Sequence, residues 1–504
     1  MNHIFYKQTA CFFLLFVVAC CFTRSSAQDY DYSHRKRDCE IKIIASEGTP
    51  LVTLIGIGQI SNDFAFGGKI CSKALDTLGD ECGEKFLSYF DYGTPKEEMM
   101  WEYVTRCSKK CDHDFSKADF LVDWMQKNHI PVRGSNLFSN EKEELIPQWA
   151  RDLESGTFKQ AMQEHIDASI QHFKGKLSQW DLITESFQGQ NYRASSSGIL
   201  QTKSGDPEIF SWIIDEARKI DPLSNFIISH CNIVSSNDFT IADQFISMFK
   251  PLSSKFDIIG VQGHFQAHMD KSSYEPKINY LAEQLGKPVW LTELDFSLDI
   301  NQAPEKIEEL MRTCFANPNV GGIFVDNWYR SSDSDDNLSS YFVDSMGNET
   351  PVGERWREVR NEWKTMETGY TDDSGKFYFN GFPGKYHILI SCFLDSFYLE
   401  PGEGTQNIVV VSHAESGINK RSASLKTTEF LINGKTAKIR LPHLYNKQLF
   451  LTTYSLSGQQ LSRSLIRVNG GKLMLTPAHS SCRILRIETV DREPLYTGKI
   501  LSAN

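Results

Sequence analysis

The stretch WDLITE (Trp180–Glu185) is an apolar run that stops on a glutamate, and VWLTELD (Val289–Asp295) repeats the pattern. Each stretch predicts a buried β-strand rich in Trp, Val, Ile and Leu. Strands buried on both faces are typical of parallel sheets, and α/β barrels keep their chemistry at the carboxyl ends of such strands. We therefore expect Glu185 and Glu293 to face each other across the mouth of a barrel.

A pair of strand-end carboxyl groups is what a retaining glycosidase requires. In that chemistry one carboxylic acid protonates the leaving oxygen, and the second attacks the anomeric carbon from about 5–5.5 Å away. The competing interpretation is that each glutamate is a solvated residue at the start of a loop, which is the usual state of a single glutamate at a strand end. Further motifs are needed to choose between the two.

Both stretches resemble segments of glycoside hydrolase family 10, the endo-xylanase family. The family's acid/base strand ends in Trp-Asp-Val-Val-Asn-Glu, which Trp180–Glu185 matches in type, and its nucleophile strand ends in Thr-Glu-Leu-Asp, which Thr292–Asp295 matches in full. The resemblance implies that Glu185 is the acid/base and Glu293 the nucleophile. It also implies a (β/α)8 TIM barrel and endo-acting hydrolysis of a β-1,4-linked polysaccharide without a cofactor.

A third motif supports the same assignment. Gln262-Gly263-His264 matches the family's Gln-Gly-His, whose histidine holds the nucleophile in place, so His264 is expected to orient Glu293. A histidine at a strand end is otherwise usually a satisfied core residue. The resemblance further implies a set of substrate-binding residues, namely Gln262, Thr184, Trp101, Glu98, Trp328 and Arg133.

Several positions of the family's sugar-binding pocket carry other residues in this chain. The family's Glu-Asn-Glu-Met-Lys-Trp appears as Lys96–Trp101, so Glu97 and Met100 stand where an asparagine and a lysine grip sugar hydroxyls. Its Arg-Gly-His-Thr-Leu-Val-Trp-His appears as Arg133–Asn140, which removes a histidine and a stacking tryptophan. Asp326 stands about where a tryptophan floor is expected. We expect unsubstituted xylan to be a poor substrate.

Two functions from different classes remain open. The first is a retaining β-glycanase whose pocket suits another β-linked sugar or a decorated xylan. The second is a secreted, catalytically impaired barrel that binds glycans or serves in an extracellular matrix. Retention of both glutamates together with Gln262 and His264 favours the enzyme. An assay over a panel of β-glycans distinguishes the two.

Composition and the first residues indicate where the protein acts. The 504 residues include 40% hydrophobic side chains and carry a net charge of -11, with a pI near 5.7. The acidic balance argues against nucleic acid or an anionic membrane surface as a partner. Residues 1–27 have the charged start, apolar core and small-residue end of a signal peptide, and no later run predicts a membrane span. We expect a secreted, extracellular monomer with a polysaccharide partner.

The cysteines and two glycosylation motifs fit an oxidising destination. Three of the 12 cysteines fall within residues 1–27, which leaves nine, so at least one thiol is free or pairs outside the chain. Cys107 and Cys111 have the spacing of half a metal site. With no second half nearby we favour a disulfide or two separate partners, and expect no metal. Asn337 and Asn348 begin Asn-x-Ser/Thr motifs and are candidate glycosylation sites.

Alternating strand and helix patterns predict one (β/α)8 barrel over residues 39–366. Its first strand is expected at Leu51–Gly58. Its helices include Ile209–Ile220 and Ala303–Phe315, which precede the strands Asn225–Ser229 and Gly322–Val325.

Composition divides the rest of the chain into segments. The residues after the predicted signal peptide are short and polar, whereas those after the barrel alternate in hydrophobicity and are rich in turn residues. The predicted division is a disordered arm over 28–38, a β extension over 367–411, a polar linker over 412–425 and an all-β appendage over 426–504.

Overall fold

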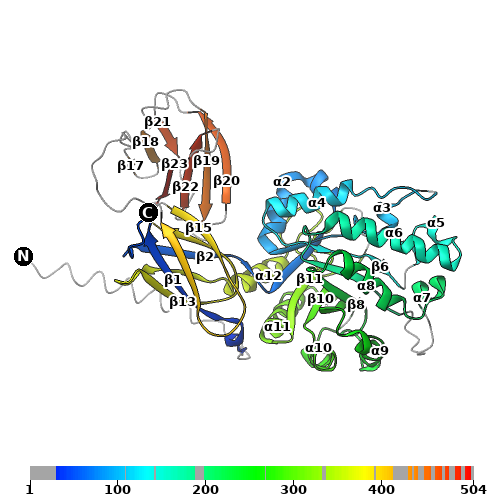
Figure 1. Cartoon of the computed structure of the whole chain (residues 1–504). Coiled ribbons are helices and arrows are strands. Elements are labelled where there is room, and N and C mark those ends of the chain that lie inside the picture. Colours follow the sequence, from blue (N-terminus) through cyan, green and yellow to red (C-terminus); the bar gives the residue numbers. More distant parts are fainter. Residues whose placement is uncertain are drawn as a thin grey trace, which may run out of the picture.

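The computed structural model describes residues 30–412, apart from 108, 141–142, 188–197, 267, 332–335 and 391–392, and the strands between 430 and 500. Figure 1 shows a helix-ringed barrel and, beside it, β-sheets that contain strands from both ends of the described chain. The predicted signal peptide and, apart from Ser412, the predicted linker lie outside the described residues. Within the described part, no helix combines the length and apolar character needed to cross a membrane.

Eight parallel strand positions form the barrel, which confirms the predicted fold. The strands are β3 (Ala65–Ile70), β4 (Tyr92–Pro95), β5 (Arg133–Gly134) with β6 (Phe138–Ser139), β7 (Gln179–Thr184), β8 (Asn225–His230), β9 (Ile258–Phe265), β10 (Val289–Phe296) and β11 (Val320–Val325). The sheet order is β4-β3-β11-β10-β9-β8-β7-β5, and β6 pairs with the carboxyl end of β7. A parallel bridge between Gly93 and Val132 joins β4 to the chain entering β5 and closes the ring.

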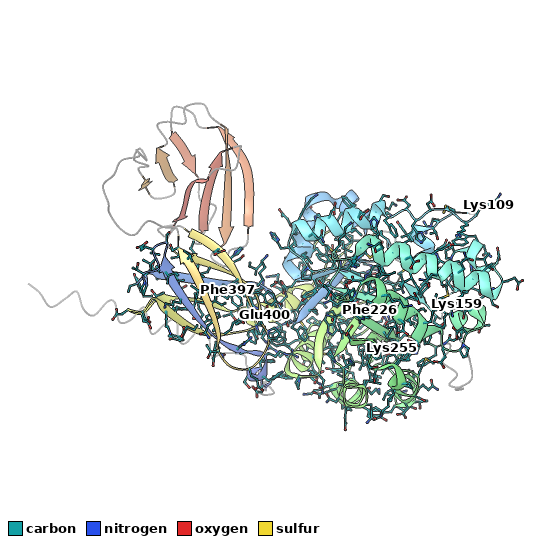
Figure 2. The ribbon with its side chains drawn as sticks, viewed as in Figure 1. Lys109, Lys159, Phe226, Lys255, Phe397 and Glu400 are labelled. Carbon is teal, nitrogen blue, oxygen red and sulfur yellow. A yellow bond between two sulfur atoms is a disulfide. The ribbon has the colours of Figure 1, made fainter. Side chains whose placement is uncertain are left out.

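Helices surround the barrel strands (Figure 1). They are α2 (Ser72–Tyr89), α3 (Trp101–Val104), α4 (Ser116–Lys127), α5 (Gln148–Arg151), α6 (Ser155–Phe173), α7 (Ile199–Ser204), α8 (Ile209–Ile220), α9 (Thr240–Phe249), α10 (Lys271–Leu285), α11 (Ala303–Ala316) and α12 (Pro351–Glu362), with the short 3-10 helices η2 (Glu143–Leu145) and η3 (Lys250–Leu252). Helix α8 buries Ile209, Ile213 and Ala217 on one face, the spacing of an amphipathic helix. Side chains fill the layer between helices and strands, as at the fully buried Phe226 of β8 (Figure 2).

Strand β3 requires two successive glycines. A Cβ atom added at Gly67 would lie 2.2 Å from Cε1 of Phe324, and one added at Gly68 would lie 2.6 Å from Cε2 of Phe90. Both distances are shorter than any tolerable carbon–carbon contact, so the two aromatic rings pack directly on the backbone of β3. This packing fixes the position of the next residue, Lys69, near the carboxyl end of the strand.

A β-sandwich beside the barrel combines strands from both sides of it in the sequence (Figure 1). The strands are β1 (Arg37–Ala45), β2 (Leu54–Asn62), β12 (Met366–Tyr370), β13 (Lys376–Gly381), β14 (Gly384–Ile390), β15 (Phe393–Leu399) and β16 (Gln406–Ser412). They form two sheets, β13-β1-β16 and β12-β2-β14-β15. Apolar side chains from both sheets, including Ile41, Ile57 and Ile388, form a core separate from that of the barrel.

The strand expected at Leu51–Gly58 belongs to this sandwich and is not the first strand of the barrel. Strand β2 pairs antiparallel with β12 and β14. It buries alternate residues in its first half, including Ile55 and Ile57, whereas β3 buries all six of its residues. One-sided burial is typical of an antiparallel sheet, and two-sided burial of a parallel barrel. The barrel sheet therefore begins at Ala65, and the sandwich includes more than the β extension predicted over 367–411.

The segment expected to be a disordered arm, 28–38, is folded where the structure describes it. It contains the 3-10 helix η1 (Ser33–Arg35) and the start of β1. Arg35 donates from Nη2 to the carbonyl oxygens of Asn317 at 2.6 Å and Val320 at 2.8 Å. These carbonyls follow the end of α11, where a cation is stabilised by the helix dipole. The polarity of the segment therefore reflects a specific anchor and not disorder.

The described residues between 430 and 500 form two further antiparallel sheets, which agrees with the predicted all-β appendage. The strands are β17 (Phe430–Asn433), β18 (Thr436–Arg440), β19 (Gln448–Ser455), β20 (Gln460–Arg467), β21 (Lys472–Leu475), β22 (Arg483–Thr489) and β23 (Pro494–Ile500). One sheet has the order β17-β18-β21, and the other has the order β20-β19-β22-β23.

Candidate active site

Glu293 lies in β10 at the mouth of the barrel and contacts a lysine from β3. The Nζ atom of Lys69 is 2.8 Å from Oε1 of Glu293 and 2.7 Å from Oδ1 of Asp326, the residue that follows β11. The Lys69 side chain is only 5% exposed. A buried ammonium is tolerated only when it is paired, so Lys69 holds the ends of β10 and β11 together through two carboxylates.

His264, in β9, contacts the other oxygen of the same glutamate. Its Nε2 atom is 3.3 Å from Oε2 of Glu293, and its Nδ1 atom is 2.8 Å from Oδ1 of Asp295. Burial alone lowers the pKa of His264, but its hydrogen bonds to Asp295 and Glu293 outweigh burial and raise the pKa to about 10. The imidazole is therefore protonated at neutral pH and donates from both nitrogens.

Asn327 joins the two outer carboxylates and completes a ring. Its Nδ2 atom donates to Oδ2 of Asp295 at 3.2 Å and to Oδ2 of Asp326 at 3.0 Å. Its Oδ1 atom accepts a hydrogen bond from Nζ of Lys96 at 2.7 Å. We refer to the six residues that form this closed circuit as the carboxylate ring, consisting of Glu293, Lys69, Asp326, Asn327, Asp295 and His264.

The ring keeps Glu293 ionised. Burial alone raises the pKa of this carboxyl, but the charge of Lys69 and the hydrogen bond from His264 hold the pKa well below its usual range. Burial alone lowers the pKa of Lys69, but the carboxylates of Asp326 and Glu293 keep this pKa above its ordinary value. Glu293 is thus a carboxylate over the whole physiological range, as a nucleophile must be.

Glu185 follows β7 directly and has different surroundings. It is 7% exposed and adopts a positive φ of 51°. Its Oε2 atom accepts a hydrogen bond from the Ser139 hydroxyl at 2.7 Å. The preceding residue, Thr184, accepts at Oγ1 from Nδ2 of Asn136 at 2.6 Å. Strand β6 supplies the first contact, because Ser139 pairs with Thr184 in the sheet, and Asn136 lies just before β6 in the chain.

The remaining residues predicted to bind substrate lie deeper than expected. Trp101 is 2% exposed and stacks on His165, with ring centroids 5.0 Å apart. Trp328 is 3% exposed and donates from Nε1 to the carbonyl oxygen of Lys69 at 2.8 Å. The structure therefore packs both tryptophans into the core and leaves neither as a surface on which a sugar stacks.

Glu98, Gln262 and Arg133 are also buried. The Glu98 carboxylate accepts the backbone N–H of Ser72 at 2.6 Å, at the start of α2. Gln262 lies opposite Glu293 in the sheet register. Arg133 lies inside the barrel, where it contacts Asp181 at 3.1 Å and donates to the carbonyl oxygen of Thr292 at 3.0 Å. Its contacts support the strand that carries Glu293.

The site also contains four residues that were not predicted as site residues, namely Lys69, Asp326, Asn327 and Ser139. The signal for Lys69 was a lysine inside the otherwise apolar and glycine-rich strand AFGGKI, because a lysine is almost never fully buried without a partner. The signal for Asp326 was its position directly after the last barrel strand. The sequence does not show that Lys69 and Asp326 contact each other, because β3 and β11 become neighbours only when the barrel closes.

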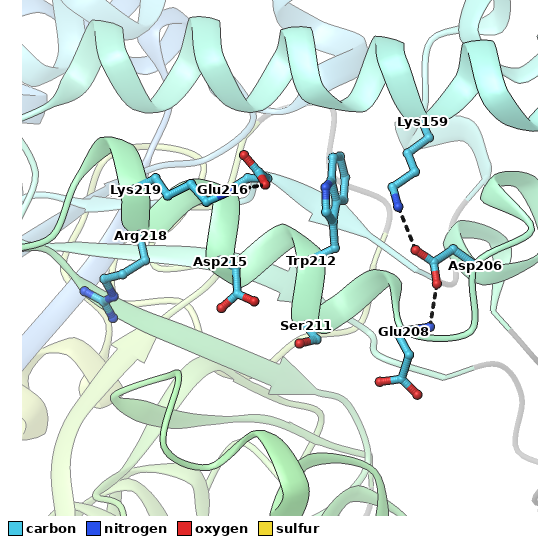
Figure 3. Close-up of a pocket in the computed structure, with 9 residues that line it drawn as sticks. All are labelled: Lys159, Asp206, Glu208, Ser211, Trp212, Asp215, Glu216, Arg218 and Lys219. Atoms are coloured by element: carbon cyan, nitrogen blue, oxygen red, sulfur yellow. Dashed lines mark hydrogen bonds and ion pairs between the residues drawn. The ribbon is translucent and has the colours of Figure 1, made fainter.

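A cavity of about 650 Å³ lies elsewhere, beside α6 and α8 on the outer layer of the barrel (Figure 3). Its ion pairs include Lys159 with Asp206 at 2.7 Å and Lys219 with Glu216 at 2.6 Å. Trp212 lies under the ammonium of Lys159. These charges neutralise one another locally and are far less buried than those of the carboxylate ring, so the cavity has the character of a solvated helix surface.

Two other predicted features can be located. Cys107 and Cys111 form a disulfide with each other, which fits one of the alternatives left open by their spacing. Asn337 and Asn348, the predicted glycosylation sites, are both exposed.

A parallel (β/α)8 barrel with two glutamates at the carboxyl ends of separate strands is the architecture of a glycoside hydrolase. The model of glycosyl hydrolase family 10 matches residues 59–350, more than half of the chain, and the chain belongs to this family.

Individual relatives agree with this membership. The chain is 28% identical to the anti-sigma-I factor RsgI6 of Acetivibrio thermocellus, over 78% of this chain and 48% of that protein. It is 25% identical to endo-1,4-beta-xylanase 3 of Arabidopsis thaliana, over 73% of this chain and 48% of that protein. The chain thus spans about half the length of these curated relatives.

Solved structures share the fold. Xylanase 10B from Thermotoga petrophila RKU-1, in complex with xylobiose, superposes with a TM-score of 0.52 and 19% identity, over 60% of this chain and 94% of that one. A family 10 structure from Paenibacillus barcinonensis gives a TM-score of 0.52 and 20% identity, over 60% of this chain and 95% of that one. At these identities the likeness concerns the barrel alone.

Proposed function

We propose that the protein is a secreted, retaining glycoside hydrolase that cleaves a β-1,4-linked polysaccharide within the chain. The observation that carries the proposal lies at the barrel mouth: Glu293 is held as a carboxylate between Lys69 and His264, and Glu185, directly after β7, accepts a hydrogen bond from the Ser139 hydroxyl. Two glutamates on separate strands of one barrel, one of them held as a carboxylate, are the pair that a retaining glycosidase uses as nucleophile and acid/base.

In the first step, an oxygen of Glu293 attacks the anomeric carbon and forms a glycosyl ester. The bond to the leaving oxygen breaks, and that oxygen takes the proton of Glu185. In the second step, Glu185 removes a proton from water, the water oxygen attacks the anomeric carbon, and Glu293 leaves as a carboxylate. Two inversions give retention of configuration. His264 donates to Glu293 throughout and orients it.

The buried tryptophans support a substrate other than plain xylan. Trp101 and Trp328 offer no exposed ring, and Met100 replaces a lysine of the family's sugar-binding run. A stacked aromatic contact contributes about 0.5–1.5 kcal/mol beyond its buried area, so the loss of several such contacts weakens binding strongly. The polysaccharide is therefore one that polar groups at the mouth recognise, such as a decorated xylan or a related β-glycan.

The decisive experiment measures reducing sugars released from a panel of β-glycans by the wild type and by Glu293→Ala. We expect turnover of at least one glycan by the wild type, low turnover of unsubstituted xylan, and none by the variant. The second candidate function is a non-catalytic glycan-binding barrel. It is favoured by the substitution of sugar-binding residues of the family motifs, which are Glu97, Met100 and Ser135 in this chain. Equal residual release by the wild type and Glu293→Ala would establish that alternative.

A further inference from the structure

Formation of a glycosyl ester on Glu293 changes the charge balance of the carboxylate ring. In the free protein Glu293 is the anionic partner of both Lys69 and His264. Once the carboxylate becomes an ester it is neutral, so each of these cations loses one counterion. Lys69 is 5% exposed, and a buried ammonium without a partner is strongly unfavourable.

Each of the two cations has a second carboxylate already in contact. Asp326 lies 2.7 Å from Lys69, and Asp295 lies 2.8 Å from His264. Asn327 donates to both of these carboxylates and holds them in register. The arrangement is therefore symmetric around Glu293, with one cation and one reserve anion on each side.

We propose that Lys69 is a positioning residue which speeds the breakdown of the glycosyl-enzyme, and that Asp326 is its reserve counterion while the ester exists. This inference rests on the proposed retaining mechanism and extends it to a pair of residues on β3 and after β11. Lys69 acts through Glu293 and does not contact the sugar carbon.

The bonds and charges that change in the second step, hydrolysis of the glycosyl ester, show how Lys69 acts. Water attacks the anomeric carbon, its proton passes to Glu185, and the bond between that carbon and the Glu293 oxygen breaks. The electron pair of the broken bond stays on Glu293, which becomes a carboxylate again. Negative charge thus develops on an oxygen beside the Lys69 ammonium, and a fixed cation at such a position lowers the barrier.

The contact between Lys69 and Glu293 opposes the first step, attack by Glu293, unless Asp326 is also present beside Lys69. When Glu293 attacks, its charge disappears, and Lys69 would be left unpaired in a buried position. Asp326 prevents this because it is not esterified and lies 2.7 Å from the Lys69 ammonium. Loss of Lys69 and loss of Asp326 should therefore affect opposite halves of the reaction, whereas a purely structural contact between β3, β10 and β11 would affect both halves alike.

The test compares Lys69→Met, Asp326→Asn and Lys69→Arg in the full-length protein, with an activated aryl β-glycoside as substrate. Release of the aryl group reports the first step, and mass spectrometry of the intact protein reports the accumulated glycosyl-enzyme. Lys159→Met is the matched control, because it removes a lysine that contacts an aspartate at the same 2.7 Å on the outer layer (Figure 3).

We expect Lys69→Met to show a burst of aryl release and to accumulate glycosyl-enzyme, with breakdown slowed about 10²- to 10³-fold. Asp326→Asn should instead slow the burst phase itself and accumulate no intermediate. Lys69→Arg keeps the charge and should restore breakdown, and Lys159→Met should behave as wild type. Melting temperatures identify any variant that fails to fold.

The outcomes separate this inference from the proposed function. If the wild type forms neither product nor glycosyl-enzyme, the retaining mechanism fails and this inference fails with it. If the wild type turns over but Lys69→Met and Asp326→Asn slow the same step, only the inference is overturned. If Lys69→Met does not fold, a slowed burst in Asp326→Asn supports the inference, and an unchanged burst refutes it.

Discussion

On the β10 side of the barrel mouth Glu293 is met by two cations, whereas on the β7 side Glu185 accepts a hydrogen bond from the hydroxyl of Ser139. The first environment stabilises a negative charge. In the second, a hydroxyl group at the end of β6 donates a hydrogen bond to one carboxyl oxygen. Two glutamates on separate strands of one barrel thus have different neighbours, and such neighbours determine the chemistry of a carboxyl group.

The sharpest way to test this contrast is to remove the nucleophile. Glu293→Ala should reduce turnover about 10⁴-fold or more, because no other group can form the glycosyl ester. Initial rates on the best substrate of the panel measure the effect. Glu208→Ala, which removes an exposed glutamate beside the outer cavity, is the matched control and should keep wild-type activity. Equal loss of activity in Glu293→Ala and Glu208→Ala would show that the surroundings of Glu293 give it no special role.

Removal of the acid/base should have a smaller and conditional effect. Glu185→Ala should still form the intermediate from an activated aryl glycoside, because that leaving group needs little protonation, but hydrolysis of the intermediate should slow. Azide needs no general base and should restore turnover by producing a β-configured glycosyl azide. The product is identified by NMR. An α-configured azide, or no rescue at all, would contradict the assignment of Glu185.

The hydrogen bond on the β7 side should contribute less than either glutamate. A typical hydrogen bond is worth about 0.5–1.5 kcal/mol, so Ser139→Ala should lower kcat/KM about 2- to 10-fold. The loss should be greater for a substrate with a poor leaving group than for an activated one. Ser211→Ala is the control, since it also removes a hydroxyl that makes a side-chain hydrogen bond, which Ser211 accepts from Lys255 at 2.8 Å on the outer layer.

The smallest predicted effect is on stability and depends on pH. The pKa of His264 is raised from 6.5 to about 10, so its contribution is complete below pH 6.5 and is lost as the pH rises through 10. The pKa of Glu293 is lowered from 4.5, so its contribution is complete above pH 4.5 and is lost on acidification. The carboxylate ring should stabilise the fold most between these limits.

Thermal unfolding of wild type and His264→Asn measures this dependence. The difference in melting temperature should be largest between pH 4.5 and 6.5, and should shrink by about 3 °C as the pH approaches 10. A difference that does not change with pH would show that His264 stabilises the barrel by packing and not by its charge.

The sequence predicted the barrel because each helix and strand carries its own local pattern. Helix α8, predicted at Ile209–Ile220, has the same bounds in the structure. The strand at Leu54–Asn62 was assigned to the wrong sheet, since its partners in β12 and β14 lie far away in the sequence and leave no local signal. A short apolar run looks the same whichever sheet it joins.

The candidate site also contains residues that local motifs predicted and residues whose partners are distant in the sequence. The strand-end motifs predicted Glu185, Glu293 and His264, and the roles of these residues stay predictions until they are assayed. Lys69 belongs to no motif, and its two carboxylate partners come from other strands. The resemblance predicted that Trp101 and Trp328 bind substrate, whereas both rings are buried, one against His165 and one beside Lys69. The burial of a ring depends on partners from distant parts of the chain, which a local motif does not specify.

The sandwich built from β1, β2 and β12–β16 also constrains the order in which the protein can be completed during synthesis. Thr53 and Thr371, which hydrogen-bond to each other, are 318 residues apart. At about 5–20 residues per second, the ribosome needs roughly 15–60 s to supply the missing strands. During that time the apolar faces of β1 and β2 have no native partner, and unpaired strand edges recruit other chains. A chain that stops after α12 should therefore aggregate even though its barrel is complete.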